Sequence, residues 1–341
     1  MNLPLFQNYE SLYSYLSNLY VSSGYLSARQ FMEDIYGKQV AIDKDFFNSF
    51  NKGFFTELCK THDWKEIVLN HTCFKYFTRF ITNEQRKLAW KEAMKNGNRL
   101  RRYVILPRNY NSYNERKLKY CPCCLLDQQV PYYSINHQYK ESTVCPACGC
   151  YLRETTVRSD SAHLGVFHPA VDECVSECLK TAKEDDINYL LSVYIDKVNR
   201  CDLIIHCKST IGEYLNNRLK GTKYLKGVRG GKKDIEGLYK DMMDYYKCLI
   251  VNPLTKSHLK FHFEDKMVNP YEICMIGMFL RIKPDDLASY GKRPVKSVKD
   301  EVDSKIIKLY NEGNKYCEIA GILNCNRETV RKVVNKELKR R

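Results

Sequence analysis

The sequence predicts a mostly α-helical protein with a central zinc-ribbon-like module and a C-terminal helix-turn-helix. Apolar residues recur at helical spacing on both sides of the chain's middle, where two Cys-x-x-Cys pairs stand 20 residues apart. A chain of 341 residues is long enough for two or three domains with a sizeable core. We predict a helical N-terminal domain (1–102), a zinc-binding module (103–155), a helical domain (156–290) and the helix-turn-helix unit (291–341).

The helical regions are indicated by amphipathic periodicity. In residues 10–20 four apolar side chains recur on one helix face. Residues 45–58 add five phenylalanines, enough aromatic surface to anchor a small core. Residues 83–95 form a further helix pattern that ends at Gly97. Beyond the cysteine region, helical patterns return at 184–199, 211–219, 234–246 and 270–280.

Two close cysteine pairs predict a metal site. Cys121 and Cys124 form one pair, Cys145 and Cys148 form the other, and each pair contains a proline that favours a tight turn. Gly149 supplies a conformationally permissive residue after the second pair. Four thiolates suit tetrahedral Zn²⁺ and leave no open position for water, so we expect a structural zinc ion rather than a catalytic one.

A second zinc site is an open alternative. Cys174 and Cys178 would share one face of a helix, which fits simple burial as well as metal binding. Further potential ligands lie at Cys201, Cys207, His168 and His206.

The C-terminal unit has the layout of a helix-turn-helix. Helix patterns cover residues 302–312, 316–323 and 326–334, and Asn326 can cap the last of them. Asn324 can adopt the left-handed conformation that the turn needs. We expect an apolar core of Ile306, Ile307, Leu309, Ile322, Leu323, Cys325, Val330 and Val333 or Val334. The residues left free to contact a DNA major groove and its phosphates are Arg327, Glu328, Thr329, Arg331 and Lys332.

Net charge agrees with a nucleic-acid partner without establishing one. The chain carries +15 and has a pI near 9.0, a balance that Lys-rich composition alone can produce. Residues 218–233 contain seven basic residues and no acidic one, and Lys232 and Lys233 there are further candidate DNA contacts. Residues 291–341 hold 14 Lys and Arg against 7 Asp and Glu. A solvated charged face is the alternative reading of both clusters.

Membrane and enzyme classes are disfavoured. The longest apolar run, residues 274–280, is far shorter than a membrane helix, and the first thirty residues lack the apolar core of a signal peptide. We therefore expect a cytoplasmic protein. The glycines near Lys232 do not form a phosphate-binding loop, and the common metalloprotease, hydrolase and deaminase motifs are absent from the sequence. We expect no enzymatic activity, although a nuclease built from scattered acids stays open.

Short motifs in the cysteine region and on both sides of it in the sequence form a recognisable set. The most specific are Lys119-Tyr-Cys-Pro-Cys-Cys124, Pro131-Tyr-Tyr133, His137-Gln138 and Val144-Cys-Pro-Ala-Cys-Gly149. Others are Glu10-Ser-Leu12, His71-Thr72, Phe74-Lys-Tyr-Phe77 and Asn269-Pro270. Together they resemble the TniQ/TnsD family of transposition target-site selectors. The family usually has His as the fourth zinc ligand, where this chain has Cys148.

The resemblance implies a role in transposition. Such proteins bind double-stranded target DNA, or a complex already bound there, and recruit a AAA+ ATPase, to which the N-terminal half would be presented. One alternative is an adaptor that bridges an RNA-guided CRISPR effector, with its guide RNA, to the same ATPase. A further alternative is a zinc-containing helix-turn-helix transcription regulator, which would need no ATPase.

Overall fold

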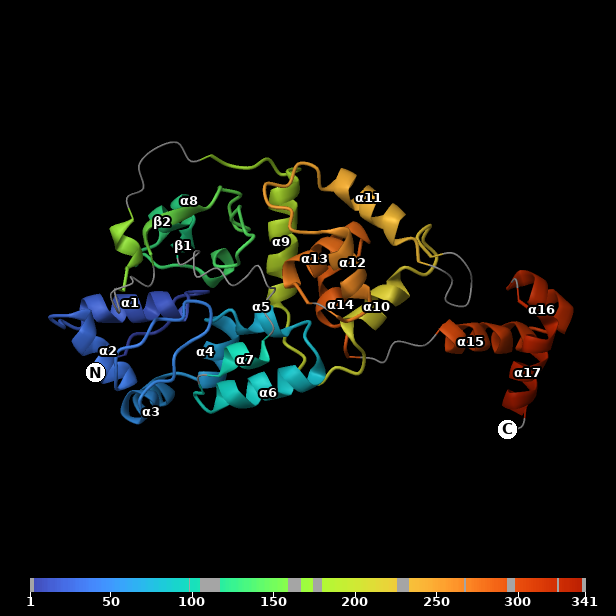
Figure 1. The fold of residues 1–341 in the computed structure, drawn as a ribbon, viewed down its shortest axis with the longest axis horizontal. Helices are drawn as coiled ribbons and strands as arrows, with labels where there is room; N and C mark the ends of the chain where they lie inside the picture. The colour runs from blue at the N-terminus through green and yellow to red at the C-terminus, as the bar shows by residue number, and fades with distance from the viewer. Residues whose placement is uncertain are drawn as a thin grey trace.

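The computed structural model describes most of the chain. Its described residues are 3–97, 99–104, 117–158, 167–173, 180–225, 233–266, 268–292, 298–323 and 325–338. Predicted features at Lys232, Asn324, Cys174 and Cys178 lie outside these residues. The described part is mostly helical, as the sequence predicts, with helices on both sides of a small two-stranded sheet (Figure 1).

The N-terminal region is a set of short helices with polar caps. Its elements are α1 (Leu12–Ser22), α2 (Ala28–Tyr36), α3 (Lys52–Thr61), α4 (Trp64–Asn70), α5 (Phe74–Thr78), α6 (Asn83–Met94) and α7 (Leu100–Tyr103). The Ser11 hydroxyl accepts the backbone N–H of Ser14 at the start of α1, and Thr82 and Gln85 form a capping box at the start of α6.

Aromatic side chains fill the core of this region. Phe46, Phe47, Phe50 and Phe54 are buried, which confirms the predicted aromatic anchor, and Phe55 packs partly buried against it. The predicted apolar face of α1 is also confirmed, since Leu12, Tyr15, Leu16 and Leu19 are buried.

The cysteine module consists of a short hairpin-like sheet and two turns. Its elements are β1 (Lys117–Tyr120), α8 (Pro122–Asp127), the 3₁₀ turn η2 (Ile135–His137) and β2 (Arg153–Arg158). The strands β1 and β2 pair antiparallel, with Tyr120 opposite Arg153. This arrangement is the zinc-ribbon-like module that the sequence predicts.

The module is fixed to α1 by backbone pairing. The N–H of Ser11 donates to the carbonyl of Tyr133 at 2.9 Å, and the N–H of Tyr133 donates to the Ser14 hydroxyl at 3.0 Å. The N–H of Leu12 donates to the carbonyl of His71 at 2.7 Å. Motifs that are far apart in sequence, around residues 10–12, 71–72 and 131–133, are therefore neighbours in the fold.

The second helical region begins after the module. Its elements are η3 (Ala170–Asp172), α9 (Ile187–Arg200), α10 (Ile211–Arg218), α11 (Ile235–Tyr245), α12 (Lys256–Phe263), α13 (Pro270–Phe279) and α14 (Pro284–Ala288). The four predicted helices are confirmed as α9, α10, α11 and α13. The short helices α12 and α14 were not predicted, because five to eight residues give too little periodicity to recognise.

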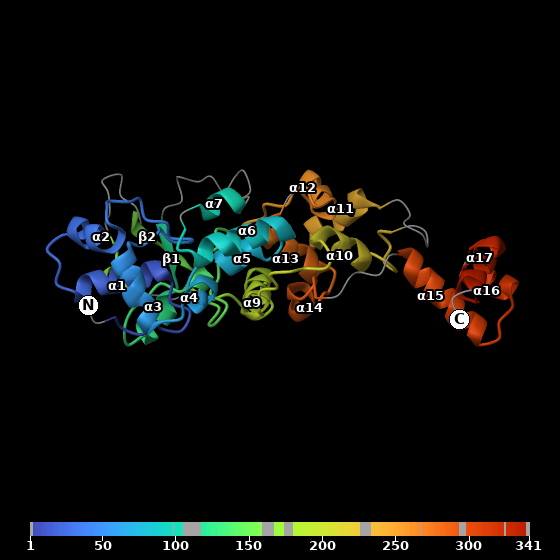
Figure 2. The same cartoon turned by 90° about the horizontal axis from the view of Figure 1, so that it is seen from below.

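The core continues from the N-terminal region into the second helical region. Buried apolar residues from Leu3 to Tyr290 form one connected cluster. In both Figure 1 and Figure 2 the helices α5, α6 and α9 lie in the middle of the main body, with α1, α2 and α3 to one side and α13 and α14 to the other. No helix within the described residues has the length and apolar character needed to cross a bilayer.

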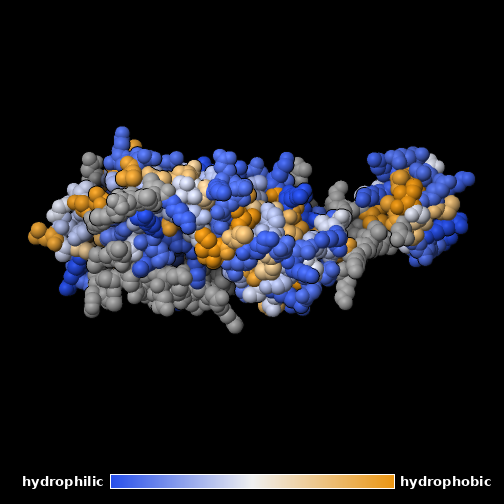
Figure 3. Space-filling model, turned by 90° about the horizontal axis from the view of Figure 1, so that it is seen from above, coloured by the Kyte–Doolittle hydropathy of each residue, from blue (hydrophilic) through white to orange (hydrophobic). Residues whose placement is uncertain are grey.

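The C-terminal unit has a core of its own. Helices α15 (Val298–Asn311), α16 (Tyr316–Ile322) and α17 (Arg327–Leu338) pack around a separate set of buried residues. These are Val302, Ile306, Ile319, Val330 and Val334. Hydrophilic residues cover most of the unit in the view of Figure 3.

The predicted core of this unit needs one correction. Leu323, Cys325 and Val333 pack partly buried against it, but Ile322 is 61% exposed, so its predicted packing is wrong. In α16 the contact with this core is made by Ile319, which is fully buried, whereas Ile322 is the last residue of the helix.

Candidate metal centre and nucleic-acid interface

The first cysteine pair lies at the start of α8. Cys121 is the N-cap residue of this helix, and Pro122 occupies its first position, where the missing N–H costs no hydrogen bond. The Cys121 sulfur accepts the backbone N–H of Cys124 at 3.5 Å. The cap geometry therefore brings both sulfurs of the pair to the same side of the helix.

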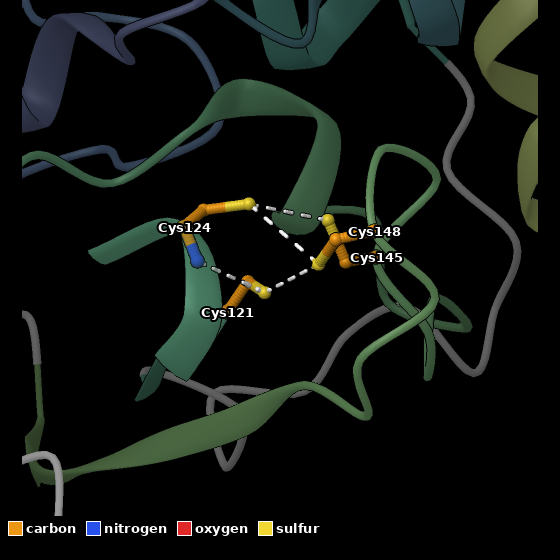
Figure 4. A group of neighbouring side chains, drawn as sticks. All are labelled: Cys121, Cys124, Cys145 and Cys148. Carbon is orange, nitrogen blue, oxygen red and sulfur yellow. Dashed lines mark hydrogen bonds between the residues drawn. The ribbon is translucent and has the colours of Figure 1, made fainter. Parts of the chain in front are cut away.

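The second pair lies in a tight turn between two short bridges. Gly149 has a φ of +73°, a left-handed conformation that favours glycine. The N–H of Gly149 donates to the carbonyl of Cys145 at 3.0 Å, and Val144 pairs with Tyr151 across the turn. This confirms the permissive role predicted for Gly149, and it places Cys145 and Cys148 facing the first pair (Figure 4).

The four sulfurs are spaced as a tetrahedral metal site requires. Their closest distances are 3.3 Å from Cys121 to Cys148, 3.6 Å from Cys124 to Cys145 and 3.8 Å from Cys124 to Cys148, and all lie within 4.8 Å. Zinc–sulfur bonds of about 2.3 Å at tetrahedral angles place sulfurs about 3.8 Å apart. The set is therefore compatible with Zn²⁺, and the thiolate donors suit it chemically.

Hydrogen bonds among the four thiols make their ionisation mutually dependent. Hydrogen bonding with Cys121 lowers the pKa of Cys148 to about 6 and lowers the pKa of Cys145 well below its usual range. Hydrogen bonding with Cys124 raises the pKa of Cys121. Without a cation the cluster retains protons, so binding of a metal ion by all four thiolates releases them.

His137 contacts the cysteine site, a contact that the sequence analysis did not predict. Its Nε2 lies 3.3 Å from the Cys145 sulfur, and the side chain is buried. The neighbouring Gln138 amide donates to the carbonyls of Lys119 and Ser134 at 2.8 and 2.9 Å. The pair His137-Gln138 thus connects the η2 turn to both halves of the cysteine site. The sequence pointed to this pair only through the family resemblance.

Within the described residues, the only group with three or more potential ligands close together is the set of four cysteines. His168 pairs with Glu173 at 2.6 Å, and the Cys207 sulfur accepts from the Arg86 guanidinium at 2.7 Å. Since Cys174 and Cys178 are outside the described residues, a second zinc site stays a prediction.

Helix α17 presents a polar stripe to solvent. Glu328, Arg331 and Lys332 are exposed and line a shallow hollow of about 390 Å³, together with Asn335 and Lys336. The Arg331 guanidinium donates to the Glu328 carboxylate at 2.9 Å. Sequence reasoning missed Asn335 and Lys336, although their spacing of i+4 from Arg331 and Lys332 would have placed them on the same face.

The remaining predicted contacts lie in different surroundings. Arg327 is exposed at the start of α17, and Thr329 is half-buried. The Asn326 carboxamide oxygen accepts the N–H of Glu328 at 2.9 Å, which confirms its predicted capping role. Lys233 is half-buried, with its ammonium 5.9 Å from the centroid of the Phe263 ring.

The fold and the site define a class: a mostly helical protein with a four-cysteine module compatible with a metal ion and a separate helix-turn-helix unit. Residues 3–152, which include the N-terminal helices and both cysteine pairs, match the TniQ family model. This part of the chain is therefore a TniQ domain, a domain associated with transposition, as the resemblance predicted. No curated protein matches the chain.

Proposed function

We propose that this chain is a DNA-binding target-site selector of a TnsD/TniQ-type transposition system, which recruits a AAA+ ATPase to the insertion site. The observation that carries the proposal is the exposed cationic stripe of α17 on a chain that also has a TniQ domain. Because Val330 and Val334 are fully buried on the inner face of α17, the outer face is free to meet a DNA groove.

The stripe on α17 has side chains that can read bases. An arginine such as Arg331 can donate hydrogen bonds to guanine, and an asparagine such as Asn335 can form a pair of hydrogen bonds with adenine. The Glu328 carboxylate can accept a hydrogen bond from the amino group of cytosine. Lys332 and Lys336 suit phosphates, which supply affinity without sequence information. Since Glu328 and Arg331 pair at 2.9 Å, one can orient the other before DNA binds.

We assign Zn²⁺ to the four cysteines as a structural ion. Bound there, it would supply the cross-link between the α8 turn and the second knuckle, and no catalytic step. The chain's own residues around it hold Tyr133 and Ser134 against α1, through the 2.9 Å bond from Ser11 and the bridge between Glu10 and Ser134. Zinc would thereby stabilise the surface that the N-terminal half offers to a partner.

Recruitment of the ATPase is the part of the proposal that comes from the family. TniQ-type proteins work with DNA and with AAA+ ATPases in general, and the TniQ match covers the N-terminal half. The sequence has no phosphate-binding loop of its own, which fits a protein that recruits an ATPase rather than acting as one.

Direct DNA binding is tested with purified protein and double-stranded target DNA, without guide RNA. We expect binding that weakens steeply with salt and falls about tenfold or more in the double variant Arg331→Ala/Lys332→Ala. The control is Lys308→Ala, an exposed lysine on α15 that pairs with Glu312. Equal affinity for both variants contradicts the assignment of α17, and binding that requires an RNA-guided effector supports the adaptor alternative.

ATPase recruitment is tested separately by pull-down with the AAA+ ATPase of the same transposition system. We expect capture by the whole chain and equal capture by the Arg331→Ala/Lys332→Ala variant, because α17 lies outside the TniQ match. A DNA-binding protein that captures no ATPase in the presence of ATP and DNA is a transcription regulator instead.

A further inference from the structure

Helices α6 and α7 carry a second concentration of positive charge. Six basic side chains are exposed along these two consecutive helices and the turn between them, and all but Arg101 are outside the described ion pairs: Lys87, Lys91, Lys95, Arg99 and Arg102. We call this set the α6–α7 basic stripe. Figures 1 and 2 both place α6 and α7 side by side, in the main body and away from the C-terminal unit.

The members of the stripe lack the ion pairs that basic residues have elsewhere on this surface. Lys60, Lys260 and Lys308 each have a carboxylate one helix turn away within 4 Å. Within the described part of the chain, no carboxylate forms an ion pair with the side chain of any of the five stripe residues. The stripe therefore presents charge that no acid among the described residues neutralises.

Arg101 gives an internal comparison. It stands among the stripe residues in sequence, but its guanidinium donates to both carboxylate oxygens of Asp43 at 2.7 Å and to Asp45 at 3.1 Å. Arg101 is thus occupied in holding α7 to the loop before α3. Arg99 and Arg102, on either side of it, are also exposed but form no ion pair among the described residues.

The arrangement on α6 is unfavourable for the helix alone. Lys87, Lys91 and Lys95 follow one another at intervals of four residues, and like charges at this spacing destabilise a helix. The opposite face of α6 is buried through Arg86, Ala89 and Ala93, so the three lysines are held outward. A repulsive row held in place by the fold is the pattern expected of a surface that meets a polyanion.

Two acidic residues stand on the same helix. Glu84 is exposed at the first turn of α6, where it favours the helix dipole. One carboxylate oxygen of Glu92 accepts the backbone N–H of Arg99 at 3.2 Å, so this side chain caps the following turn. Neither Glu84 nor Glu92 forms an ion pair with a stripe residue. With five cations against two acids, this surface keeps a net positive charge.

We propose that the α6–α7 basic stripe binds the phosphate backbone of double-stranded DNA, as a contact surface separate from α17. This inference rests on the proposed function and names a second point at which the DNA is held. Duplex DNA fits better than single strands, because the exposed side chains of α6 and α7 are basic apart from Glu84 and Leu88. None of them is an aromatic ring on which bases could stack.

Two surfaces on one chain would bind the same duplex cooperatively. Contacts of α17 supply sequence preference, whereas lysine contacts to phosphates supply affinity at any sequence. Because binding through one surface raises the effective concentration of DNA at the other, loss of either weakens binding by more than its own contacts.

The experiment compares two triple variants of the full chain that remove the same charge. The test variant is Lys87→Gln/Lys91→Gln/Lys95→Gln, and the control is Lys52→Gln/Lys65→Gln/Lys240→Gln, exposed lysines on α3, α4 and α11. Binding of duplex DNA is measured by fluorescence anisotropy over a range of salt concentrations. We expect the test variant to bind about tenfold or more weakly at 100 mM salt, and its log–log salt slope to be smaller by about 2–3.

Further arms keep the result interpretable. The variant Lys87→Arg/Lys91→Arg/Lys95→Arg retains charge and should bind like wild type, and circular dichroism should give all variants the same melting temperature. The inference is overturned if test and control variants bind duplex DNA equally while Arg331→Ala/Lys332→Ala weakens binding. It is also overturned if the test variant loses ATPase capture or RNA binding but not DNA binding. If wild-type protein binds no duplex DNA, the proposed function itself fails.

Discussion

The guanidinium of Arg86 donates a hydrogen bond to the hydroxyl of Tyr290 at 2.8 Å, across 204 residues of sequence. The same side chain is fully buried and donates to the carbonyls of Thr78 and Ile204 at 2.8 and 3.1 Å. Arg86 thus joins the N-terminal helices to the loop after α9 and to the end of the second helical region. Buried polar groups at such a junction destabilise the fold unless each has a hydrogen-bond partner.

Replacing Arg86 by Met should therefore strongly destabilise the protein. The substitution keeps most of the apolar volume but leaves several buried carbonyls without donors, each at a cost of about 1–3 kcal/mol. We expect the free energy of unfolding to fall by at least about 3 kcal/mol in denaturant titrations. The matched control, Arg29→Met, removes an exposed pair with Glu33 and should change it by about 0.5 kcal/mol or less. Equal stability of the two variants would show that Arg86 does not hold the junction.

Substitution of a zinc-binding cysteine should remove the bound zinc and destabilise the cysteine module at the same time. Metal analysis of reduced wild-type protein should find zinc bound to the chain, and Cys121→Ser or Cys145→Ser should remove the ion held by the four cysteines. Since a structural site couples metal binding to folding, these variants and chelator-treated protein should melt at lower temperature. Cys59→Ser, an exposed cysteine on α3, should behave as wild type. Zinc-free wild-type protein with an unchanged melting temperature would rule the assignment out.

His137 should tune this site without being a ligand. Its Nε2 lies 3.3 Å from the Cys145 sulfur, so an N–H donor there stabilises the thiolate. We expect His137→Phe to weaken zinc binding about 10–100-fold in competition with a chromophoric chelator, with the ion still present after purification. His206→Phe, an exposed histidine, is the control. Identical zinc affinity in the two variants would mean that the contact is packing alone.

The local features of this fold could be predicted from the sequence. Helix periodicity located α1 and α6, and two-residue spacing identified the four cysteines whose sulfurs converge. These predictions succeed because they depend on neighbours within about one helix turn. Asn326 belongs to the same group, since its capping bond reaches only two residues ahead.

Long-range relationships could not be predicted in this way. Nothing near Arg86 in the sequence points to Tyr290 or Ile204 as partners, because these contacts arise from packing of distant helices. The apolar character of Ile322 predicts burial, but this last residue of α16 is exposed and Ile319 is the one that packs in the core. In the sequence His137 is one residue of a family motif, and its contact with Cys145 is visible only in the fold.

Glu141 should make stability depend on pH. Burial raises the pKa of Glu141 from its ordinary 4.5 to about 7, and one of its carboxylate oxygens has no hydrogen-bond partner. Since the folded state binds this proton more tightly than the unfolded state, the free energy of unfolding falls as pH rises from about 4.5 to about 7. Glu141→Gln removes the ionisation. We expect it to gain about 3 kcal/mol over wild type at pH 8 and little at pH 4.5.

The comparison for Glu141 is an exposed acid. Glu84→Gln on α6 should leave the shape of the pH–stability profile unchanged, because Glu84 is exposed to solvent. Urea titrations at several pH values measure both variants. A Glu141→Gln profile parallel to that of wild type would mean that this carboxyl stays ionised when buried.

The C-terminal unit should unfold independently of the rest of the chain. Ile306 on α15 is fully buried in a core that is separate from the one spanning Leu3 to Tyr290. Ile306→Ala removes buried methyl groups and should destabilise the unit by about 2–5 kcal/mol, which is a large fraction of the stability of so small a core. Duplex DNA affinity should fall with it, because α17 loses its support, whereas zinc content and the melting transition of the main body should not change. Calorimetry and metal analysis of the same sample distinguish this outcome from a single cooperative transition, in which Ile306→Ala would lower the stability of the whole chain and the two cores would act as one.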